Sequence, residues 1–318
     1  MEQDQDSILI GSSSCLLGQQ VRFDGGHKRD RFLTNVLSEY FEFLPYCPEM
    51  ALGLGVPRPT IHLIEREGQV KLVNVKDETV EHTDQMKAIA VDYCKSLGHL
   101  SGYILKSKSP SCGMERVSVY AKNGYATKVG VGIFAQALME AWPNMPVEEE
   151  GRLNDAAIRE NFIERVFAYK RWQQMLEQGL TVARFMDFHK RHKFILLAHN
   201  EKLYRQMGKM VAETRKENLE EQAQAYISMF FEAMRSHASR KRHVNVLQHG
   251  MGYLKNDLDS DDKANLLEIF EKYAKGEVPL IVPITMLKYH FRKNPHDYIN
   301  EQFYMDPYPA ELMLRNHV

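Results

Sequence analysis

Three of the four cysteines follow short apolar segments, a pattern that can gather thiols at one place. Cys15, Cys47 and Cys112 end the segments ILIGSSSC, FEFLPYC and GYILKSKSPSC. In a parallel α/β sheet the carboxyl ends of the strands meet at one edge, and ligands bind there. The three thiols are 32 and 65 residues apart, but an edge of this kind would bring them together.

Three converging thiolates form a ligand set for a metal. Because no fourth ligand is evident, they would suit an iron–sulfur cluster with one open iron, which is a Lewis acid. Catalytic zinc with three protein ligands is the second possibility, and buried structural thiols are the third. No C-x-x-C pair is present, which argues against a zinc ribbon or a thioredoxin-type site. Cys94 lies on the apolar stripe of a predicted helix and is expected in the core.

Polar residues beside these cysteines are candidates for the chemistry. Glu49 is two residues from Cys47, so it must lie close to any metal that Cys47 binds; otherwise it is a surface glutamate. Ser109 and Ser111 either hydrogen-bond a ligand or shape the turn around the proline between them. Asp24, in FDGG, either contacts a ligand or shapes a turn. The same loop as the serines carries two lysines that would meet phosphate or remain solvated, Lys106 and Lys108.

The elements that must position these residues are those of an α/β domain. Short apolar runs predict strands at 7–10, 41–44 and 102–105, hairpins at 61–65 with 71–75 and 117–121 with 125–129, and helices at 34–40, 84–97 and 133–142. This alternation favours a parallel, Rossmann-like sheet. A linker is predicted at 141–152, from its two prolines, glycine and glutamates.

The second half is predicted to be mostly α-helical. Helical periodicity and end signals predict helices at 155–178, 181–200, 201–211, 218–237, 243–254, 259–275 and 284–292. We therefore expect two domains, residues 1–150 and residues 151–318.

Composition and charge narrow the classes of function. The 318 residues are 44% hydrophobic and 26% charged, which is typical of soluble globular proteins. No apolar run of about 18 residues predicts a membrane span, and the acidic N-terminus does not resemble a signal peptide; we expect a cytoplasmic protein. Residues 1–150 have 15 basic and 20 acidic side chains, a net of −5, and residues 151–318 have 26 and 22, a net of +4. The second half thus weakly indicates a polyanionic partner.

Basic residues of the second half are candidates for contacts with a nucleic-acid backbone. They occur in two clusters with few acids: Arg184, Lys190, Arg191 and Lys193, and Arg240, Lys241 and Arg242. One predicted helix also has three histidines that would suggest a metal site: His189, His192 and His199. No further ligands are evident, so core or surface positions are expected for them.

Residues 7–142 resemble the thiouracil desulfidase family. The resemblance is carried by SCLLG with VRFDG, then CPE, then KSKSPSCG, in that order. It implies a 4Fe-4S cluster held by Cys15, Cys47 and Cys112, with an unligated iron that takes the sulfur of a thiolated pyrimidine. It also implies that Glu49 is the acid/base carboxylate and that Ser109 and Ser111 make contacts in the site.

Residues 155–318 resemble the YbgA-type helical domain, through FMDFHKRHKFILLAHN, RHVNVLQHGMGYLK and PLIVPITMLKYH. The fusion of the two domains resembles the tRNA 4-thiouridine desulfidases. The resemblance implies that the thiolated base lies in tRNA and is converted to uridine. Two alternatives remain: a desulfidase of free thiouracil or thionucleosides, and a non-catalytic RNA-binding module with structural cysteines.

Overall fold

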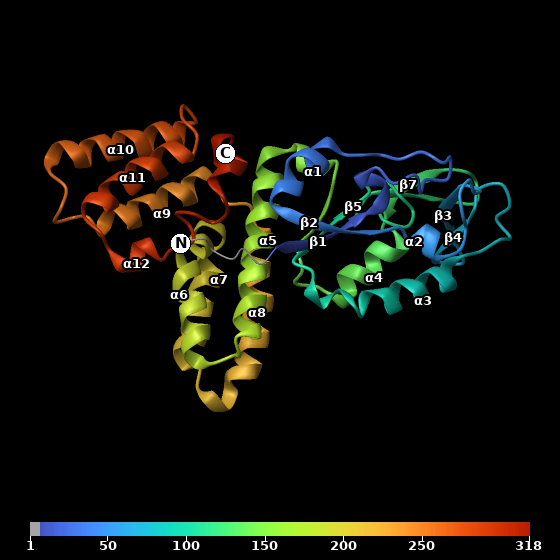
Figure 1. Cartoon of the computed structure of the whole chain (residues 1–318), viewed down its shortest axis with the longest axis horizontal. Coiled ribbons are helices and arrows are strands. Elements are labelled where there is room, and N and C mark those ends of the chain that lie inside the picture. The colour runs from blue at the N-terminus through green and yellow to red at the C-terminus, as the bar shows by residue number, and fades with distance from the viewer. Residues whose placement is uncertain (1–6) are drawn as a thin grey trace. The chain divides into compact units, whose positions relative to one another are not determined.

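The computed structural model describes residues 7–318 and divides into two compact units (Figure 1). The N-terminal unit is Met1–Asn154 and the C-terminal unit is Asp155–Val318. No helix in the described part is long and apolar enough to cross a membrane.

The N-terminal unit is built on a parallel sheet of four strands in the order β2-β1-β5-β8. These strands are β1 (Ile8–Ser13), β2 (Phe41–Tyr46), β5 (Gly102–Leu105) and β8 (Val147–Glu149). Every residue of β5 is buried, as expected for a parallel strand covered on both faces. Gly11 of β1 lies opposite Tyr103 of β5, and a Cβ atom on Gly11 would come within 2.2 Å of the tyrosine ring. Only glycine allows this strand pair to pack.

The two predicted hairpins join into a second sheet, in the order β4-β3-β6-β7. The strands are β3 (Ile61–Arg66), β4 (Gln69–Asn74), β6 (Val117–Tyr120) and β7 (Ala126–Gly130). β3 and β6 pair in parallel, with Leu63 beside Val119, and both of these side chains are buried in the core that supports the sheet.

Helices α3 (Thr83–Cys94) and α4 (Ile133–Ala141) run side by side along the parallel sheet (Figure 1). Tyr46 of β2 stacks on Tyr93 of α3 at a centroid distance of 3.6 Å, and Phe134 of α4 packs against both rings. The short helices of this unit are α1 (Arg31–Asn35), α2 (Pro48–Ala51), η1 (Ser14–Leu17), η2 (Leu37–Glu39), η3 (Leu97–His99) and η4 (Arg152–Asn154). The prediction of an α/β domain with a parallel sheet is confirmed.

The prediction of a linker at 141–152 is wrong, because β8 lies inside it and completes the parallel sheet. Glu148 and Glu149 are only 4% and 6% exposed. Their carboxylates accept hydrogen bonds from donors distant in the sequence or across a turn: Glu148 from Arg152, and Glu149 from the backbone N–H of Met114. A run of three glutamates is ordinarily solvated, and only these tertiary partners allow it to enter a sheet.

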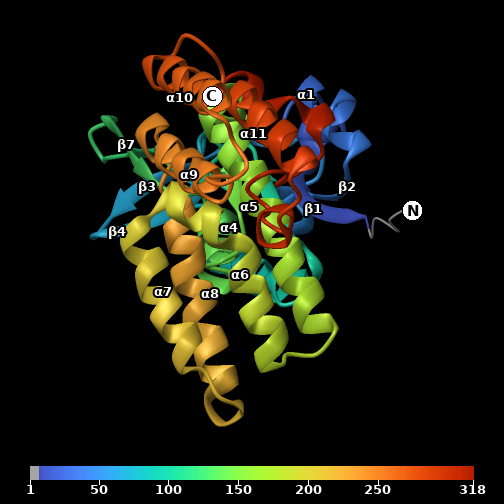
Figure 2. The same cartoon turned by 90° about the vertical axis from the view of Figure 1, so that its left-hand side faces the viewer.

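The C-terminal unit is mostly helical, as predicted (Figures 1 and 2). Its helices are α5 (Ala156–Glu177), α6 (Val182–His199), α7 (Glu201–Glu213), α8 (Leu219–Arg235), α9 (Arg240–Gly252), α10 (Ser260–Lys275), α11 (Ile281–Lys293) and α12 (Asp297–Asn300), with the single turns η5 (Lys216–Asn218), η6 (Ala310–Leu312) and η7 (Leu314–Asn316). Side-chain caps start five of them, at Asp155, Thr181, Asn200, Ser239 and Asp259. α5 to α8 pack together, and α9 to α11 form a second group.

A buried charged cluster links α5 to the last described turn of the C-terminal unit. Glu164 accepts a hydrogen bond from His199 at 2.8 Å, and Arg315 lies 3.5 Å from Glu164 and 3.6 Å from Glu160. Glu160 also accepts a bond from the Tyr308 hydroxyl at 2.8 Å. Each buried charge has an opposite or hydrogen-bonded partner, as its removal from water requires.

Candidate functional site

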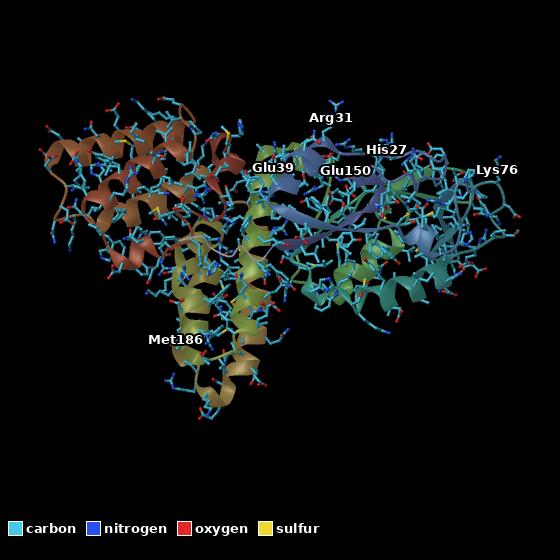
Figure 3. The ribbon with its side chains drawn as sticks, in the orientation of Figure 1. His27, Arg31, Glu39, Lys76, Glu150 and Met186 are labelled. Carbon is cyan, nitrogen blue, oxygen red and sulfur yellow. The ribbon has the colours of Figure 1, made fainter. Side chains whose placement is uncertain are left out.

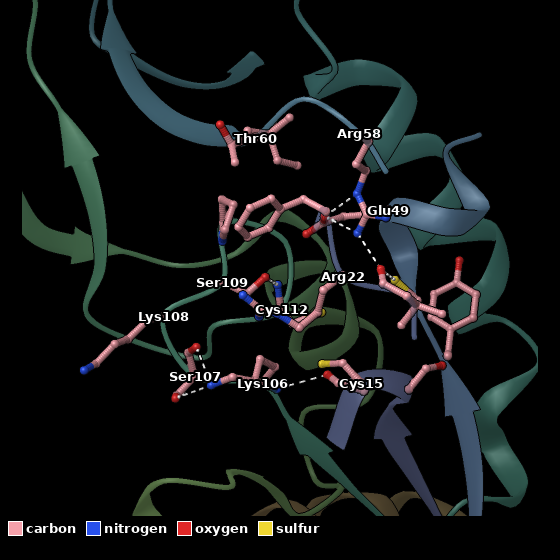
Figure 4. Close-up of a pocket in the computed structure, with 18 residues that line it drawn as sticks. Cys15, Arg22, Glu49, Arg58, Thr60, Lys106, Ser107, Lys108, Ser109 and Cys112 are labelled. Atoms are coloured by element: carbon pink, nitrogen blue, oxygen red, sulfur yellow. Dashed lines mark hydrogen bonds and ion pairs between the residues drawn. The ribbon is translucent and has the colours of Figure 1, made fainter. Parts of the chain in front are cut away.

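The three strand-end cysteines line one cavity of about 350 Å³ in the N-terminal unit (Figure 4). Cys15 lies in η1 after β1, Cys47 caps α2 after β2, and Cys112 follows β5. β2, β1 and β5 are neighbours in the parallel sheet, so their carboxyl ends bring these residues to one edge. Cys94 is 1% exposed in α3 and does not line the cavity, which agrees with its expected place in the core.

The thiols of this cavity are close enough to oppose one another's ionisation. Burial raises the pKa of Cys15 to about 11, and the nearby Cys47 adds to the shift. Burial likewise raises the pKa of Cys47, and that of Cys112 lies well above its ordinary value, with Cys47 and Cys15 contributing. A bound metal deprotonates a coordinating thiol outright, so a cation is the natural way to hold three thiolates here.

Glu49, in the first turn of α2, is held by two partners. Arg58 donates from Nε and Nη2 to Oε2 at 3.0 and 2.7 Å. The hydroxyl of Ser111 donates to Oε1 at 3.0 Å. The carboxylate is therefore fixed in the wall that also carries Cys47 and Cys112 (Figure 4).

Arg58 is the residue that sequence reasoning missed. Its side chain is 2% exposed, and besides Glu49 it donates to the carbonyl oxygens of Val21 and Gly55 at 2.8 Å each. It ties together the loop after η1 and the loop after α2. The signal for it was a single cation in the Gly- and Pro-rich stretch GLGVPRP, nine residues beyond Glu49.

The two serines of the SPSC loop have different places. Ser109 Oγ accepts hydrogen bonds from the backbone N–H groups of Ser111 and Cys112 at 3.2 and 3.1 Å, so it shapes the loop. Ser111 instead bonds Glu49, and its backbone carbonyl accepts from Phe134 and Ala135 at the start of α4. A Cβ on Gly132 would come within 2.5 Å of that carbonyl group. The loop can approach α4 only because residue 132 is glycine.

Glu150 organises the lysine side of the cavity. It accepts from the ammonium group of Lys106, and from the backbone N–H and hydroxyl of Ser107 at 2.7 and 2.8 Å. Glu150 comes directly after β8 and is labelled in Figure 3. Lys106 and Lys108 both line the cavity, although the Lys108 side chain extends away from the cysteines in Figure 4.

Asp24 does not line the cavity. Its Oδ1 accepts from the backbone N–H of Gly26 at 3.0 Å and lies 3.6 Å from Arg22. That turn hydrogen bond is the main reason why the pKa of Asp24 is lowered. Of the two roles open to Asp24, this placement favours shaping the turn.

No group of three or more His, Cys, Asp or Glu side chains among residues 7–318 is arranged to hold a metal ion. This finding applies to a zinc ion and to an iron–sulfur cluster alike, so it does not decide between them.

Both units match known families. The family model described as 2-thiouracil desulfurase matches residues 10–150, and the one described as Protein of unknown function (DUF1722) matches residues 193–309. The uncharacterized protein YbgA of Escherichia coli (strain K12) is 30% identical over 153 residues, which are 48% of this chain and 90% of that protein. The solved structure of the 4Fe-4S-dependent thiouracil desulfidase TudS is 30% identical, with a TM-score of 0.35, and the match covers 47% of this chain and 94% of that one.

The chain joins a domain that matches the 2-thiouracil desulfurase family model to a domain of the YbgA family. The resemblances of residues 7–142 and of residues 155–318 are thereby confirmed. The N-terminal unit is called the desulfurase domain below, and the C-terminal unit the YbgA-type domain.

In the YbgA-type domain the predicted basic clusters lie on two helices, α6 and α9. Several of their members have internal partners: Lys190 pairs with Glu301, Arg184 donates to the carbonyl of Gly179, and Arg242 donates to that of His199. The three histidines of α6 are buried, as expected. His192 donates from Nδ1 to the carbonyl oxygen of Phe188 at 2.7 Å, and its Nε2 has no hydrogen-bond partner among residues 7–318. His199 is held by Glu164.

Proposed function

We propose that this chain is a desulfidase that converts 4-thiouridine in tRNA to uridine, with a 4Fe-4S cluster held by Cys15, Cys47 and Cys112. One observation carries the proposal: three thiols from neighbouring strand ends share a single cavity with an arginine-fixed carboxylate. The match to the 2-thiouracil desulfurase family supports sulfur removal from a pyrimidine.

The donor set suits the cluster. Thiolates are the soft ligands that iron–sulfur clusters require, and these three come from one edge of one sheet. When bound, a cluster with three protein ligands supplies an iron whose open position accepts sulfur as a Lewis acid.

The reaction replaces sulfur by oxygen, so that C=S and water give C=O and hydrogen sulfide. Water must add at the ring carbon and lose its protons, and Glu49 is the base in this cavity. Oε2 already accepts two N–H groups of Arg58, whereas Oε1 accepts only the Ser111 hydroxyl. Oε1 is therefore the oxygen that takes the proton. A placed general base of this kind contributes about 10²–10⁴-fold.

The cavity, which must also hold the cluster, is small enough to admit no more than a single base that has left its stack. Its volume of about 350 Å³ lies at the lower end of the range of small-molecule sites, about 300–1,000 Å³. An enzyme acting on a base within RNA must extrude that base first. Lys106 lies in the same wall, and the basic clusters of the YbgA-type domain would contact the RNA backbone. A tRNA substrate also makes the cytoplasm the expected compartment.

The test is anaerobic reconstitution with iron and sulfide, followed by incubation with thiolated tRNA and nucleoside analysis. We expect a brown protein with broad absorption near ~400 nm, loss of 4-thiouridine, and gain of uridine and sulfide. Cys47→Ala should lose both colour and turnover. Cys94→Ala is the matched control, because Cys94 is a buried thiol outside the cavity; it should keep both.

Three results would each overturn a part of the proposal. A colourless protein that binds tRNA without releasing sulfur would favour a non-catalytic RNA-binding module. Turnover of free 4-thiouracil or 4-thiouridine with kcat/KM equal to or above that of tRNA would move the substrate to the free base or nucleoside. Equal damage from Cys47→Ala and Cys94→Ala would refute the ligand assignment.

A further inference from the structure

Arg171 of α5 has an unpartnered guanidinium nitrogen in the interior of the YbgA-type domain. It donates to the carbonyl oxygen of Pro307, but its Nη1 is shielded from solvent and has no hydrogen-bond partner among residues 7–318. No ion pair joins it to a carboxylate within 4.0 Å in the described part of the chain. Burial lowers the pKa of Arg171 to about 9, and the charge of Glu164 offsets this only in part. Buried charges in proteins are ordinarily paired, so this cation lacks an anion.

A second arginine shares the aromatic ring on which Arg171 rests. The guanidinium carbons of Arg171 and Arg191 lie 3.9 and 4.3 Å from the ring centroid of Phe303. The backbone N–H of Phe303 donates to the carbonyl of Arg191 at 3.0 Å, which ties this segment to α6. Two like charges held against one ring repel each other, and an anion between or beside them would relieve that repulsion.

Both arginines line a cavity of about 560 Å³, together with Arg184 and Phe303. Asp187 is the one acidic side chain of its lining, against three guanidinium groups. Glu301, which does not line the cavity, is paired with the ammonium group of Lys190. The cavity thus has an excess of positive charge, planar donors and an aromatic wall.

We propose that this pocket binds the phosphate group of a nucleotide, either within an RNA chain or as a free nucleotide. Guanidinium forks match phosphate oxygens in pairs, which lysines do not. An aromatic or arginine plane beside them offers a stacking surface for a base. If the phosphate belongs to RNA, the inference rests on the proposed function in tRNA. It adds two residues to the expected RNA contacts, Arg171 and Phe303, which the sequence did not indicate.

Direct binding to the full chain tests the pocket without any thiolated substrate. Uridine monophosphate and inorganic phosphate are titrated by calorimetry, and unthiolated tRNA is titrated by filter binding over a range of salt concentrations. We expect Arg191→Gln and Arg171→Gln each to weaken the binding of uridine monophosphate about tenfold, as the loss of one charge-assisted contact does. Arg205→Gln is the matched control, because Arg205 is an exposed arginine of α7 paired with Glu201; it should change affinity less than twofold.

The tRNA arm distinguishes the two sources. If the variants lose tRNA affinity as much as they lose affinity for uridine monophosphate, and the slope of log affinity against log salt concentration falls by about one, the pocket binds the RNA backbone. If only the binding of uridine monophosphate is weakened, the pocket binds a free nucleotide. If wild-type protein binds neither phosphate probe, or if Arg191→Gln binds all probes as the wild type does, the proposal is overturned. Arg191→Gln keeps the test valid should Arg171→Gln fail to fold. Failure of desulfurisation would leave these binding results untouched.

Discussion

We predict that replacing Arg58 strongly lowers the unfolding free energy of the desulfurase domain, because Arg58 holds Glu49 and two loops beside the cavity. The variant Arg58→Met removes a side chain that is 2% exposed from a carboxylate that is 16% exposed. Glu49 would keep one donor, Ser111, and the carbonyls of Val21 and Gly55 would lose the guanidinium N–H groups that bond them. Removing one partner of a buried ion pair costs about 3–5 kcal/mol of unfolding free energy.

The companion variant Glu49→Gln sharpens this prediction. In the double variant Arg58→Met/Glu49→Gln no charge is left unpaired, and the remaining cost comes from the two carbonyls that lose the Arg58 N–H groups, about 1–3 kcal/mol. The double variant should therefore be more stable than the sum of the single changes implies, with a coupling of about 2 kcal/mol.

The assay is urea unfolding of iron-free full-length protein, so that cluster loss does not enter the measurement. The chain has two tryptophans, Trp142 and Trp172, one in each domain. In a Trp172→Phe background the fluorescence of Trp142 reports the desulfurase domain alone. A cost below about 1 kcal/mol for Arg58→Met, or additivity within about 0.5 kcal/mol, would refute the description of Glu49 and Arg58 as a buried pair.

Two further predictions follow from the packing and the charges. Gly132→Ala should displace the loop of Cys112, because its Cβ would lie 2.5 Å from the Ser111 carbonyl group. We expect a loss of about 1–3 kcal/mol in unfolding free energy and impaired iron incorporation. The control Gly151→Ala, whose Cβ would have its nearest contact at an ordinary 3.7 Å, should bind iron normally. The YbgA-type domain should lose stability as the pH falls below about 6.5, because burial lowers the pKa of three histidines. Below that pH these histidines are protonated in the unfolded chain but stay neutral in the folded domain, which favours unfolding. The pKa values are about 4 for His189, about 3 for His243 and well below the ordinary value for His192. Each of these three histidines contributes up to about 1.4 kcal/mol of stability loss per pH unit, whereas His199 opposes them because its pKa is raised. Urea unfolding followed by Trp172 fluorescence at pH 7 and pH 5 measures the net loss. Equal unfolding free energies at the two pH values would contradict the prediction.

The meeting of the cysteines was predictable because it follows from one rule of parallel sheets. Each thiol comes after a short apolar run, and these runs form the adjacent strands β2, β1 and β5. The ion pairs around the cavity were not predictable in this way. Arg58 and Glu49 are nine residues apart, and Lys106 and Glu150 are 44 apart. Such partners are chosen by tertiary packing, and no local periodicity marks them.

The helices of the second half were the most accessible part of the fold. Their caps and periodicity are local, and Asp155, Asp259 and Gly276 lie at the expected ends. β8 was the least accessible, since Val147–Glu149 has too few apolar residues to indicate a strand. Its place in the sheet depends on Tyr103 beside Val147 and on distant donors for its carboxylates.

The two domains differ in how much of the chain must be synthesised before each can complete its fold. The desulfurase domain has all its strands and their partners once residues 147–154 have emerged, because β8 pairs with β5 and Arg152 donates to Glu148. The carboxylates of Glu160 and Glu164 in α5, by contrast, lack their arginine partner until Arg315 is synthesised about 150 residues later. The nascent chain thus passes through a long interval in which one half is folded and the amphipathic helices of the other lack their final partners. Chaperones that hold hydrophobic nascent segments would act on this second half, and a stalled or truncated translation product would keep a finished sulfur site on an unfinished second domain.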